Sequence, residues 1–241
     1  MIPIDRGSDL HTHSTLTDGA DSPQRMADAA AAAGLRTWGL SDHVRTTSDW
    51  VVDYVRTVRG LRVADLTIRC GVEAKILDTT GALDLPATLP ELDYVLVADH
   101  QFPSASGPVH PREIARRVDA GELPARAVVD DLIGATAAAV ARAPFRPIVV
   151  HPFSLLPKMG LSEGDVHDEH LRSLATACRD AGAAIEINEK WRCPSSPVAL
   201  RLHALGVELV AGTDAHRCAD VGRWSYLDEV ARDGAFAAAG P

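Results

Sequence analysis

Short apolar runs alternate along the chain with longer segments in which apolar residues recur at helical spacing. Runs such as IVV, EIN and VELVAG are too apolar for a sheet with one face in water. They are typical of a parallel sheet that is covered on both faces. The pattern predicts seven strands, at Ser8–His13, Thr37–Asp42, Leu66–Ile76, Tyr94–Asp99, Ile148–His151, Ala183–Asn188 and Val207–Thr213.

The segments between these strands carry the end signals of helices. Ser22 is a good N-cap, Pro23 suits the first helical position, and Gly34 is placed to end that helix. Gly182 and Gly206 stand where C-terminal glycines are expected. Further helices are predicted at Trp50–Arg59, Pro111–Ala120, Ala125–Ala141, Asp165–Ala181 and Pro197–Leu205.

This order of elements predicts an α/β fold in which helices cover a parallel sheet. No linker, repeat or low-complexity tract interrupts the 241 residues, so one domain is the simplest interpretation. The longest loops are expected at Gly81–Pro90 and Gln101–Pro111. Periodicity does not decide whether the sheet closes into a barrel.

Charge and hydropathy exclude some classes of protein. The formal net charge of −9 argues against a general electrostatic grip on nucleic acid, although a local basic pocket for a small anion remains compatible with it. The N-terminal MIPIDRGSDL has no long apolar run, and no stretch approaches a membrane span. We therefore expect a cytoplasmic protein whose cysteines are reduced thiols rather than ligands: Cys70, Cys178, Cys193 and Cys218.

Charged or metal-binding residue types stand at the end of every predicted strand. In chain order they are His11 and His13, Asp42 and His43, Glu73, Asp99 and His100, His151, Glu186 to Lys190, and Asp214 and His216. The carboxyl ends of parallel strands meet at one edge of the sheet, where active sites form. Residues two apart on a strand share a face, so each of the HTH and DAH pairs is able to reach one ion.

Imidazole and carboxylate ligands without thiolates favour Zn, Fe or Mn. Glu73, Asp214 and Asp18 would offset the charge of bound ions. The other four histidines lie in helical or loop segments, and we expect them to face solvent: His110, His167, His170 and His203.

Basic residues near these strand ends are candidates for binding a phosphate group. If the sixth strand continued past Asn188, then Lys190 and Arg192 would share a face with Glu186. Lys75, two residues after Glu73, and Arg45, two after His43, are further candidates; a solvated loop charge is an equal alternative for each of the four. Trp191 either stacks on a ring of the substrate or packs between loops.

The ordered motifs DLHTHS…DG, SDH, GVE, ADH, VHP and GTDAH resemble those of the PHP (polymerase and histidinol phosphatase) family, from Ser8 to His216. The resemblance implies a distorted (β/α)7 TIM-like barrel over residues 1–241, with a trinuclear metal centre that hydrolyses phosphoesters. It also implies three divalent ions, Zn, Fe or Mn. The first would be held by His11, His13, Glu73 and Asp214. The second would share Glu73 as a bridge and add His100 and His151. The third would be held by Asp18, His43 and His216.

The resulting functional hypothesis is a metal-dependent phosphatase or phosphodiesterase for a small phosphorylated metabolite, with histidinol phosphate as the first candidate. A metal-bound hydroxide would attack phosphorus, with Glu73, Asp214 and His216 as the catalytic residues. One alternative is a non-enzymatic module that binds metal or a ligand, which the complete ligand set argues against. Another is an amidohydrolase, whose barrels also begin with HxH; Glu73 after the third strand favours the phosphoesterase.

Overall fold

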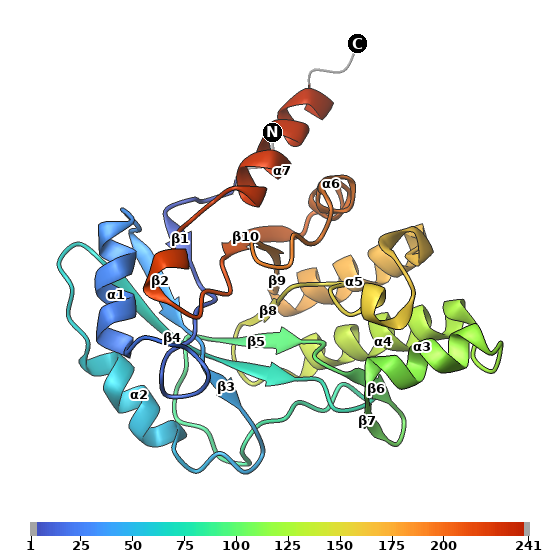
Figure 1. Cartoon of the computed structure of the whole chain (residues 1–241), viewed down its shortest axis with the longest axis horizontal. Helices are drawn as coiled ribbons and strands as arrows, with labels where there is room; N and C mark the ends of the chain where they lie inside the picture. Colours follow the sequence, from blue (N-terminus) through green and yellow to red (C-terminus); the bar gives the residue numbers. More distant parts are fainter. Residues whose placement is uncertain (1–3, 239–241) are drawn as a thin grey trace.

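The computed structural model describes residues 4–238 and contains an eight-stranded parallel sheet (Figure 1). Its strands are β1 (Ser8–Asp9), β2 (Thr37–Leu40), β3 (His43–Val44), β4 (Thr67–Lys75), β5 (Tyr94–Ala98), β8 (Pro147–Val149), β9 (Ala184–Asn188) and β10 (Glu208–Gly212). The strands pair in the order β1-β2-β4-β5-β8-β9-β10, and β3 pairs with the end of β4. Two short strands, β6 (Phe102–Ser104) and β7 (Gly107–Val109), form a separate hairpin.

Helices surround the sheet, with α1 and α2 on one side of the molecule and α3, α4 and α5 on the other (Figure 1). The α-helices are α1 (Pro23–Ala32), α2 (Val51–Gly60), α3 (Pro111–Asp119), α4 (Ala125–Arg142), α5 (Asp168–Ala181), α6 (Ser196–Ala204) and α7 (Tyr226–Ala238). Three short 3-10 helices are η1 (Leu156–Met159), η2 (Glu163–Asp165) and η3 (Cys218–Asp220). None of the helices described is both long and apolar enough to cross a membrane.

The two end strands, β1 and β10, are joined by a buried carboxylate rather than by a regular ladder. Asp9 accepts hydrogen bonds from the Thr213 hydroxyl at 2.6 Å and from the Thr213 and Gly222 main-chain N–H groups at 3.1 and 3.2 Å. Just beyond, the His13 N–H donates to the carbonyl of Ala215 at 2.8 Å. The sheet is therefore nearly closed, which confirms the predicted barrel-like α/β fold.

Side chains fill the interior of this sheet. Tyr94 and Leu96 of β5 and Ile148 of β8 belong to an apolar cluster inside it. The Tyr94 ring lies so close to two neighbouring strands that a Cβ at Gly39 or Gly71 would lie within 2.2 Å of its atoms. Because the interior is packed, open space for a ligand lies at the strand ends rather than along the axis.

The predicted element order is confirmed, but several boundaries differ. β1 ends at Asp9 rather than His13, and β8 ends at Val149 rather than His151, because the chain leaves the ladder there. His151 and Asp214, which follow β8 and β10, have positive φ values of 32° and 52°. α5 begins at Asp168 rather than Asp165, since η2 occupies the preceding residues. The sequence pattern did not reveal β3, α7 or the β6–β7 hairpin inside the expected loop Gln101–Pro111.

The predicted helix cap at Ser22 is confirmed, whereas the predicted exposure of the remaining histidines is only partly correct. The Ser22 hydroxyl accepts from the Arg25 N–H at 3.4 Å, as expected of an N-cap. His110 and His167 are exposed and His203 is half-buried. The prediction that His170 faces solvent is wrong: it is 5% exposed, and its Nε2 lies 2.7 Å from Asp130 Oδ1. This pair joins α5 to α4, an approach between helices that no local pattern encodes.

Candidate metal centre

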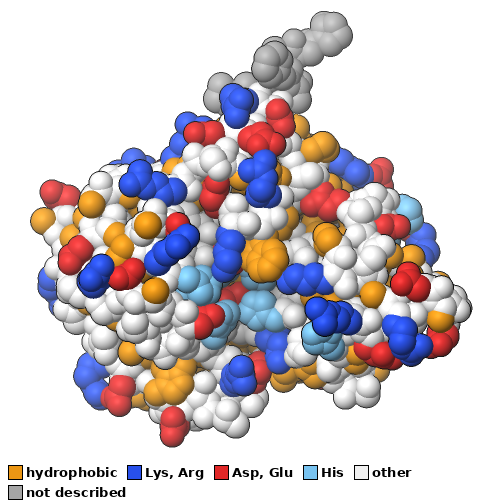
Figure 2. Space-filling view, viewed as in Figure 1, with side chains coloured by type: hydrophobic (Ala, Val, Ile, Leu, Met, Phe, Trp, Pro, Cys, Tyr) orange, Lys and Arg blue, Asp and Glu red, His pale blue; other side chains and the backbone are white. Residues whose placement is uncertain are grey.

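The candidate ligands converge from six different strands at the carboxyl edge of the sheet. Figure 2 shows histidine side chains exposed in a hollow of this face, with Lys and Arg side chains around it. Three overlapping groups have ligand atoms within 4.8 Å of one another. They are His13, Asp18, His43 and His216; His11, His13 and Glu73; and His43, Glu73 and His100.

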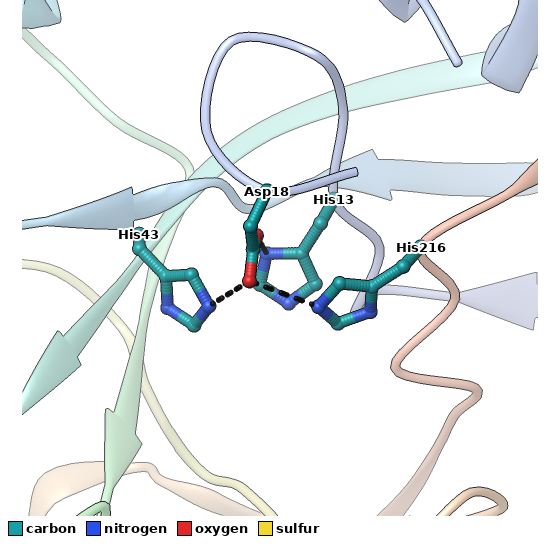
Figure 3. A group of neighbouring side chains, drawn as sticks. All are labelled: His13, Asp18, His43 and His216. Carbon is teal, nitrogen blue, oxygen red and sulfur yellow. Dashed lines mark hydrogen bonds and ion pairs between the residues drawn. The ribbon is translucent and has the colours of Figure 1, made fainter. Parts of the chain in front are cut away.

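The first group is assembled around the exposed loop that follows β1. In Figure 3 the Asp18 carboxylate lies between His43 and His216, with His13 beside it. Asp18 Oδ2 is 3.3 Å from Nε2 of both His43 and His216, and Asp18 Oδ1 is 3.9 Å from His13 Nδ1. The Ala20 N–H donates to the carbonyl of His216, which ties the Asp18 loop to the segment after β10.

Glu73 is buried at the centre of the other two groups. Its Oε1 lies 2.9 Å from His100 Nε2 and 3.0 Å from His151 Nε2. Its Oε2 lies 2.9 Å from His43 Nδ1. The same Oε2 faces His13 Nε2 at 3.4 Å and His11 Nε2 at 3.6 Å. One carboxylate thus has the position of a bridge between two sets of imidazoles.

Asp214 closes the centre on the β10 side. Its Oδ1 lies 3.5 Å from His13 Nε2, 3.9 Å from His11 Nε2 and 3.3 Å from His216 Nδ1. Its backbone has a positive φ of 52°, a conformation that is uncommon for a non-glycine residue and often found at functional sites. All nine predicted ligands are therefore brought to one centre. Their role as metal ligands remains a prediction.

Unpaired buried atoms show that this donor set fits metal ions. His11 Nε2 and both ring nitrogens of His13 are buried without a hydrogen-bond partner. Glu73 Oε2 is also buried and makes no hydrogen bond of regular geometry, although His43 Nδ1 lies 2.9 Å away. Buried polar atoms rarely lack a partner, because each one costs about 1–3 kcal/mol when left unsatisfied. His11 Nε2 and His13 Nε2 face Glu73 Oε2, and His13 Nδ1 faces Asp18. These are the nitrogen and oxygen donors that Zn, Fe and Mn accept.

The protonation of the centre depends on competition between burial and charge. Burial disfavours the charged imidazole of His151, but Asp99 and Glu73 outweigh it and raise the pKa of His151 to about 10. Burial opposes ionisation of Glu73 and Asp214, yet the surrounding imidazoles lower the pKa of both carboxyls. Burial lowers the pKa of His13, which keeps that ring in the neutral form that binds metal. Protons therefore occupy part of the site that cations would fill.

The four candidate phosphate-binding residues are not equivalent. Lys190 Nζ lies 3.3 Å from Asp214 Oδ1 and 3.2 Å from His216 Nδ1, at the edge of the centre. Arg192 instead pairs with Glu229 of α7 at 2.6 Å, with its guanidinium over the Tyr226 ring. The premise of a shared face is wrong, because β9 ends at Asn188 and the chain turns before Arg192.

Lys75 and Arg45 line a cavity of about 680 Å³ beside Glu73 and His100. Lys75 Nζ lies 3.1 Å from Gln101 Oε1 and 3.9 Å from Asp84 Oδ2, so it is partly engaged within this cavity.

The sequence analysis assigned no role to two carboxylates that support the centre, Asp42 and Asp99. Asp42 accepts hydrogen bonds from the Ser14 N–H at 2.9 Å and the Ser14 hydroxyl at 2.7 Å, which fixes the chain between His13 and Asp18. Asp99 Oδ1 lies 3.5 Å from His151 Nδ1. Both aspartates directly precede a candidate ligand in the SDH and ADH motifs, and that position was the signal that could have found them.

The chain resembles several proteins over most of its length. It is 26% identical to a protein of Acetivibrio thermocellus named "Probable phosphatase", over 92% of this chain and 86% of the relative. It is 25% identical to a probable phosphatase of Vibrio vulnificus, over 91% of this chain and 78% of the relative. Among solved structures, the histidinol phosphate phosphatase of Lactococcus lactis, complexed with zinc, L-histidinol and phosphate, has a TM-score of 0.65. That likeness covers 96% of this chain and 92% of the other at 15% identity, and it concerns the fold.

A family model described as the PHP domain matches residues 9–190, about three quarters of the chain. The matched residues include every candidate ligand except Asp214 and His216, which the fold brings to the same centre. The predicted family is therefore confirmed: the chain belongs to the PHP domain family.

Proposed function

We propose that this protein is a metal-dependent phosphatase that hydrolyses a small phosphorylated metabolite. The observation that carries the proposal is that His11 Nε2 and His13 Nε2 are buried, lack a hydrogen-bond partner and face the Glu73 carboxylate. The two curated relatives named as probable phosphatases support the same reaction class. The zinc, L-histidinol and phosphate of the structural neighbour suggest histidinol phosphate as the first substrate to test.

The nine converging residues would hold three divalent ions. We assign His11, His13, Glu73 and Asp214 to the first ion. We assign Glu73, His100 and His151 to the second. We assign Asp18, His43 and His216 to the third, which is the group that lies nearest to solvent because Asp18 is 52% exposed. The three groups of ligand atoms support this division in part. One group contains all three ligands assigned to the third ion, and another contains three of the four assigned to the first. The remaining group contains Glu73 and His100 of the second ion, with His43 in place of His151.

When bound, such ions lower the pKa of a coordinated water and neutralise phosphoryl oxygens. The side chains around the centre would then bind and orient the substrate. Lys190, at the edge of the centre, is placed to offer its ammonium to a phosphoryl oxygen. Asp214 and His216, whose side chains lie 3.3 Å apart, would hold the proton that hydrolysis transfers.

The remainder of the substrate would occupy the cavity that Arg45 and Lys75 line. Its volume of about 680 Å³ is within the range of small-molecule sites, on the order of 300–1,000 Å³. Its opening onto His43 and His100 places it directly beside the candidate metal centre. We therefore assign it to the leaving group of a phosphomonoester.

The test is a panel of phosphorylated metabolites, including histidinol phosphate and a chromogenic monoester and diester. It is assayed with protein stripped of metal and then reconstituted with Zn²⁺, Mn²⁺ or Fe²⁺. We expect phosphate release that depends on metal and is faster for a monoester than for a diester. Metal binding without any turnover would favour the non-enzymatic module, and turnover of cyclic amides instead of phosphoesters would favour the amidohydrolase.

A further inference from the structure

β9 and the turn after it carry two polar side chains that touch candidate ligands without being ligands in the proposed assignment, and a third that links these two. They are Glu186, Asn188 and Trp191, here called the β9 bracket. Glu186 and Asn188 are buried, at 1% and 0% exposure. Polar side chains so deep in a parallel sheet require partners, and those partners show what the bracket does.

Glu186 contacts two candidate ligands with its two oxygens. Its Oε1 lies 2.8 Å from His11 Nδ1, and its Oε2 accepts the main-chain N–H of His151 at 2.7 Å. A carboxylate is an acceptor only, so His11 Nδ1 must carry the proton. The lone pair of a neutral His11 ring is then on Nε2, the unpartnered atom that faces Glu73 and Asp214. Glu186 thus fixes both the tautomer and the direction of His11.

The bracket continues from Glu186 to Asp214. Asn188 Nδ2 donates to Glu186 Oε2 at 2.9 Å, and Asn188 Oδ1 accepts the main-chain N–H of Trp191 at 2.8 Å. The Trp191 indole Nε1 then donates to Asp214 Oδ2 at 2.8 Å. With Oδ2 held by the indole, the other oxygen of Asp214 faces His11 and His13.

Gly212 at the end of β10 leaves the space in which Glu186 lies. A Cβ at position 212 would be 1.8 Å from Glu186 Oε1 and 3.0 Å from His11 Cβ. Any larger residue would therefore displace the Glu186 carboxylate from His11. The first residue of the GTDAH motif is therefore a glycine because a side chain there would collide with Glu186. This explanation does not depend on the candidate ligands Asp214 and His216.

We propose that the β9 bracket is a set of positioning residues that orients His11 and Asp214 toward one metal ion. This inference rests on the proposed function, because it requires that the centre bind metal. The bracket has no contact with Asp18, His43 or His216 among the hydrogen bonds of residues 4–238. The β9 bracket should therefore affect the affinity for the ion assigned to His11 and Asp214. It should not affect the affinity for the ion assigned to Asp18, His43 and His216.

The test compares the Zn²⁺ and Mn²⁺ affinities of Glu186→Gln and Trp191→Phe with those of the wild type, by competition with a chromophoric chelator. The amide of a glutamine would place a donor against either His11 Nδ1 or the His151 N–H. Phenylalanine retains the ring but has no donor for Asp214. We expect each substitution to weaken one binding step by roughly tenfold to a hundredfold, while another step keeps the wild-type affinity.

Two substitutions of the same chemical type serve as controls. Glu189→Gln alters a carboxylate that accepts from the main chain at the start of α7, and Trp224→Phe alters an indole that donates to the carbonyl of Arg6 at 3.1 Å. Neither side chain has a hydrogen bond to His11 or Asp214 among the residues that the structure describes. Both controls should bind metal as the wild type does.

Gly212→Ala should displace the Glu186 carboxylate from His11 without changing Glu186 itself. It should weaken the same metal-binding step as Glu186→Gln. The double variant should lose no more metal affinity at that step than the more strongly affected single variant. Circular dichroism melts of metal-free protein establish that each variant is folded. Folded variants that bind every ion with wild-type affinity would overturn the inference, as would equal loss at all binding steps. A wild type that binds no metal would instead overturn the proposed function.

Discussion

At the scale of single residues, Glu73 is distinguished by the imidazoles around its carboxylate. His43, His100 and His151 each lie within 3.0 Å of one of its oxygens. His216 lies at the rim, with its side chain 27% exposed. In the proposed assignment, Glu73 would hold two ions at a fixed separation, whereas His216 would bind one.

We therefore expect Glu73→Gln to lower kcat/KM at least about tenfold more than His216→Ala, a difference of about 1.4 kcal/mol in transition-state stabilisation. Metal content, measured on the same samples, should also fall further in Glu73→Gln. His203→Ala, in a half-buried position on α6, is the control and should leave both quantities unchanged. Equal losses in activity and metal for Glu73→Gln and His216→Ala would show that Glu73 is not a bridge.

Lys190 and Arg192 form a natural pair of test and control. Lys190 faces Asp214 and His216, whereas Arg192 is held by Glu229. A charge-assisted contact with a phosphoryl oxygen is worth about 1.5–3 kcal/mol, so Lys190→Ala should lower kcat/KM roughly tenfold to a hundredfold with metal content intact. Arg192→Ala should stay within about twofold of the wild type. The reverse order in steady-state assays would place the phosphate contact at Arg192.

At the scale of elements, one side chain makes three of the hydrogen bonds that close the sheet between β1 and β10. Asp9 of β1 accepts three hydrogen bonds from Thr213 and Gly222, on the segments that follow β10. An asparagine in its place would keep one acceptor oxygen and turn a donor toward the other partners. Asp9 also shortly precedes the candidate ligands His11 and His13 in the chain.

Asp9→Asn should therefore lower the free energy of unfolding of metal-free protein by on the order of 2 kcal/mol. Urea denaturation followed by circular dichroism measures this difference. Asp28→Asn, on the exposed face of α1, is the matched control and should lie within about 0.5 kcal/mol of the wild type. If Asp9→Asn is as stable as Asp28→Asn, the carboxylate does not hold the two ends of the sheet together.

The sequence allowed the order of strands and the convergence of the nine candidate ligands to be predicted, because the carboxyl ends of parallel strands share one edge. It did not allow the path of the chain after each strand to be predicted. Arg192 turns away because β9 stops at Asn188, and His170 is buried because α5 packs on α4. The β9 bracket was missed for a similar reason, since Glu186 and His11 are far apart in sequence and meet only across the sheet.

At the scale of the whole molecule, the net charge of −9 contrasts with the face that carries the hollow. Lys and Arg side chains surround the exposed histidines on this face (Figure 2). Lys158, whose Nζ lies 4.1 Å from the Trp191 ring centroid, and Lys190 are two of the basic residues beside the centre. The basic side chains on this face would favour the approach of an anion to the candidate metal centre, against the net negative charge of the chain.

Protons and metal ions should compete at this centre. Although burial opposes the charged form, Asp99 and Glu73 raise the pKa of His151 to about 10, so this ring is charged at neutral pH in metal-free protein. Its charge stabilises the metal-free fold fully below the ordinary histidine pKa of 6.5, and this contribution is lost as the pH rises through about 10. Ion binding should therefore release protons, and apparent affinity should rise from about pH 6 to about pH 8. Calorimetric heats that do not vary with the ionisation enthalpy of the buffer would contradict this.

The proposed division of nine ligands among several ions is tested most directly by the number of metal ions bound per chain. Elemental analysis of purified protein, before and after reconstitution with Zn²⁺, Mn²⁺ or Fe²⁺, measures that number. We predict more than one ion per chain, approaching three after reconstitution, with phosphatase activity rising as the ions are restored. A maximum of one bound ion per chain under all three conditions would contradict the proposed multinuclear centre.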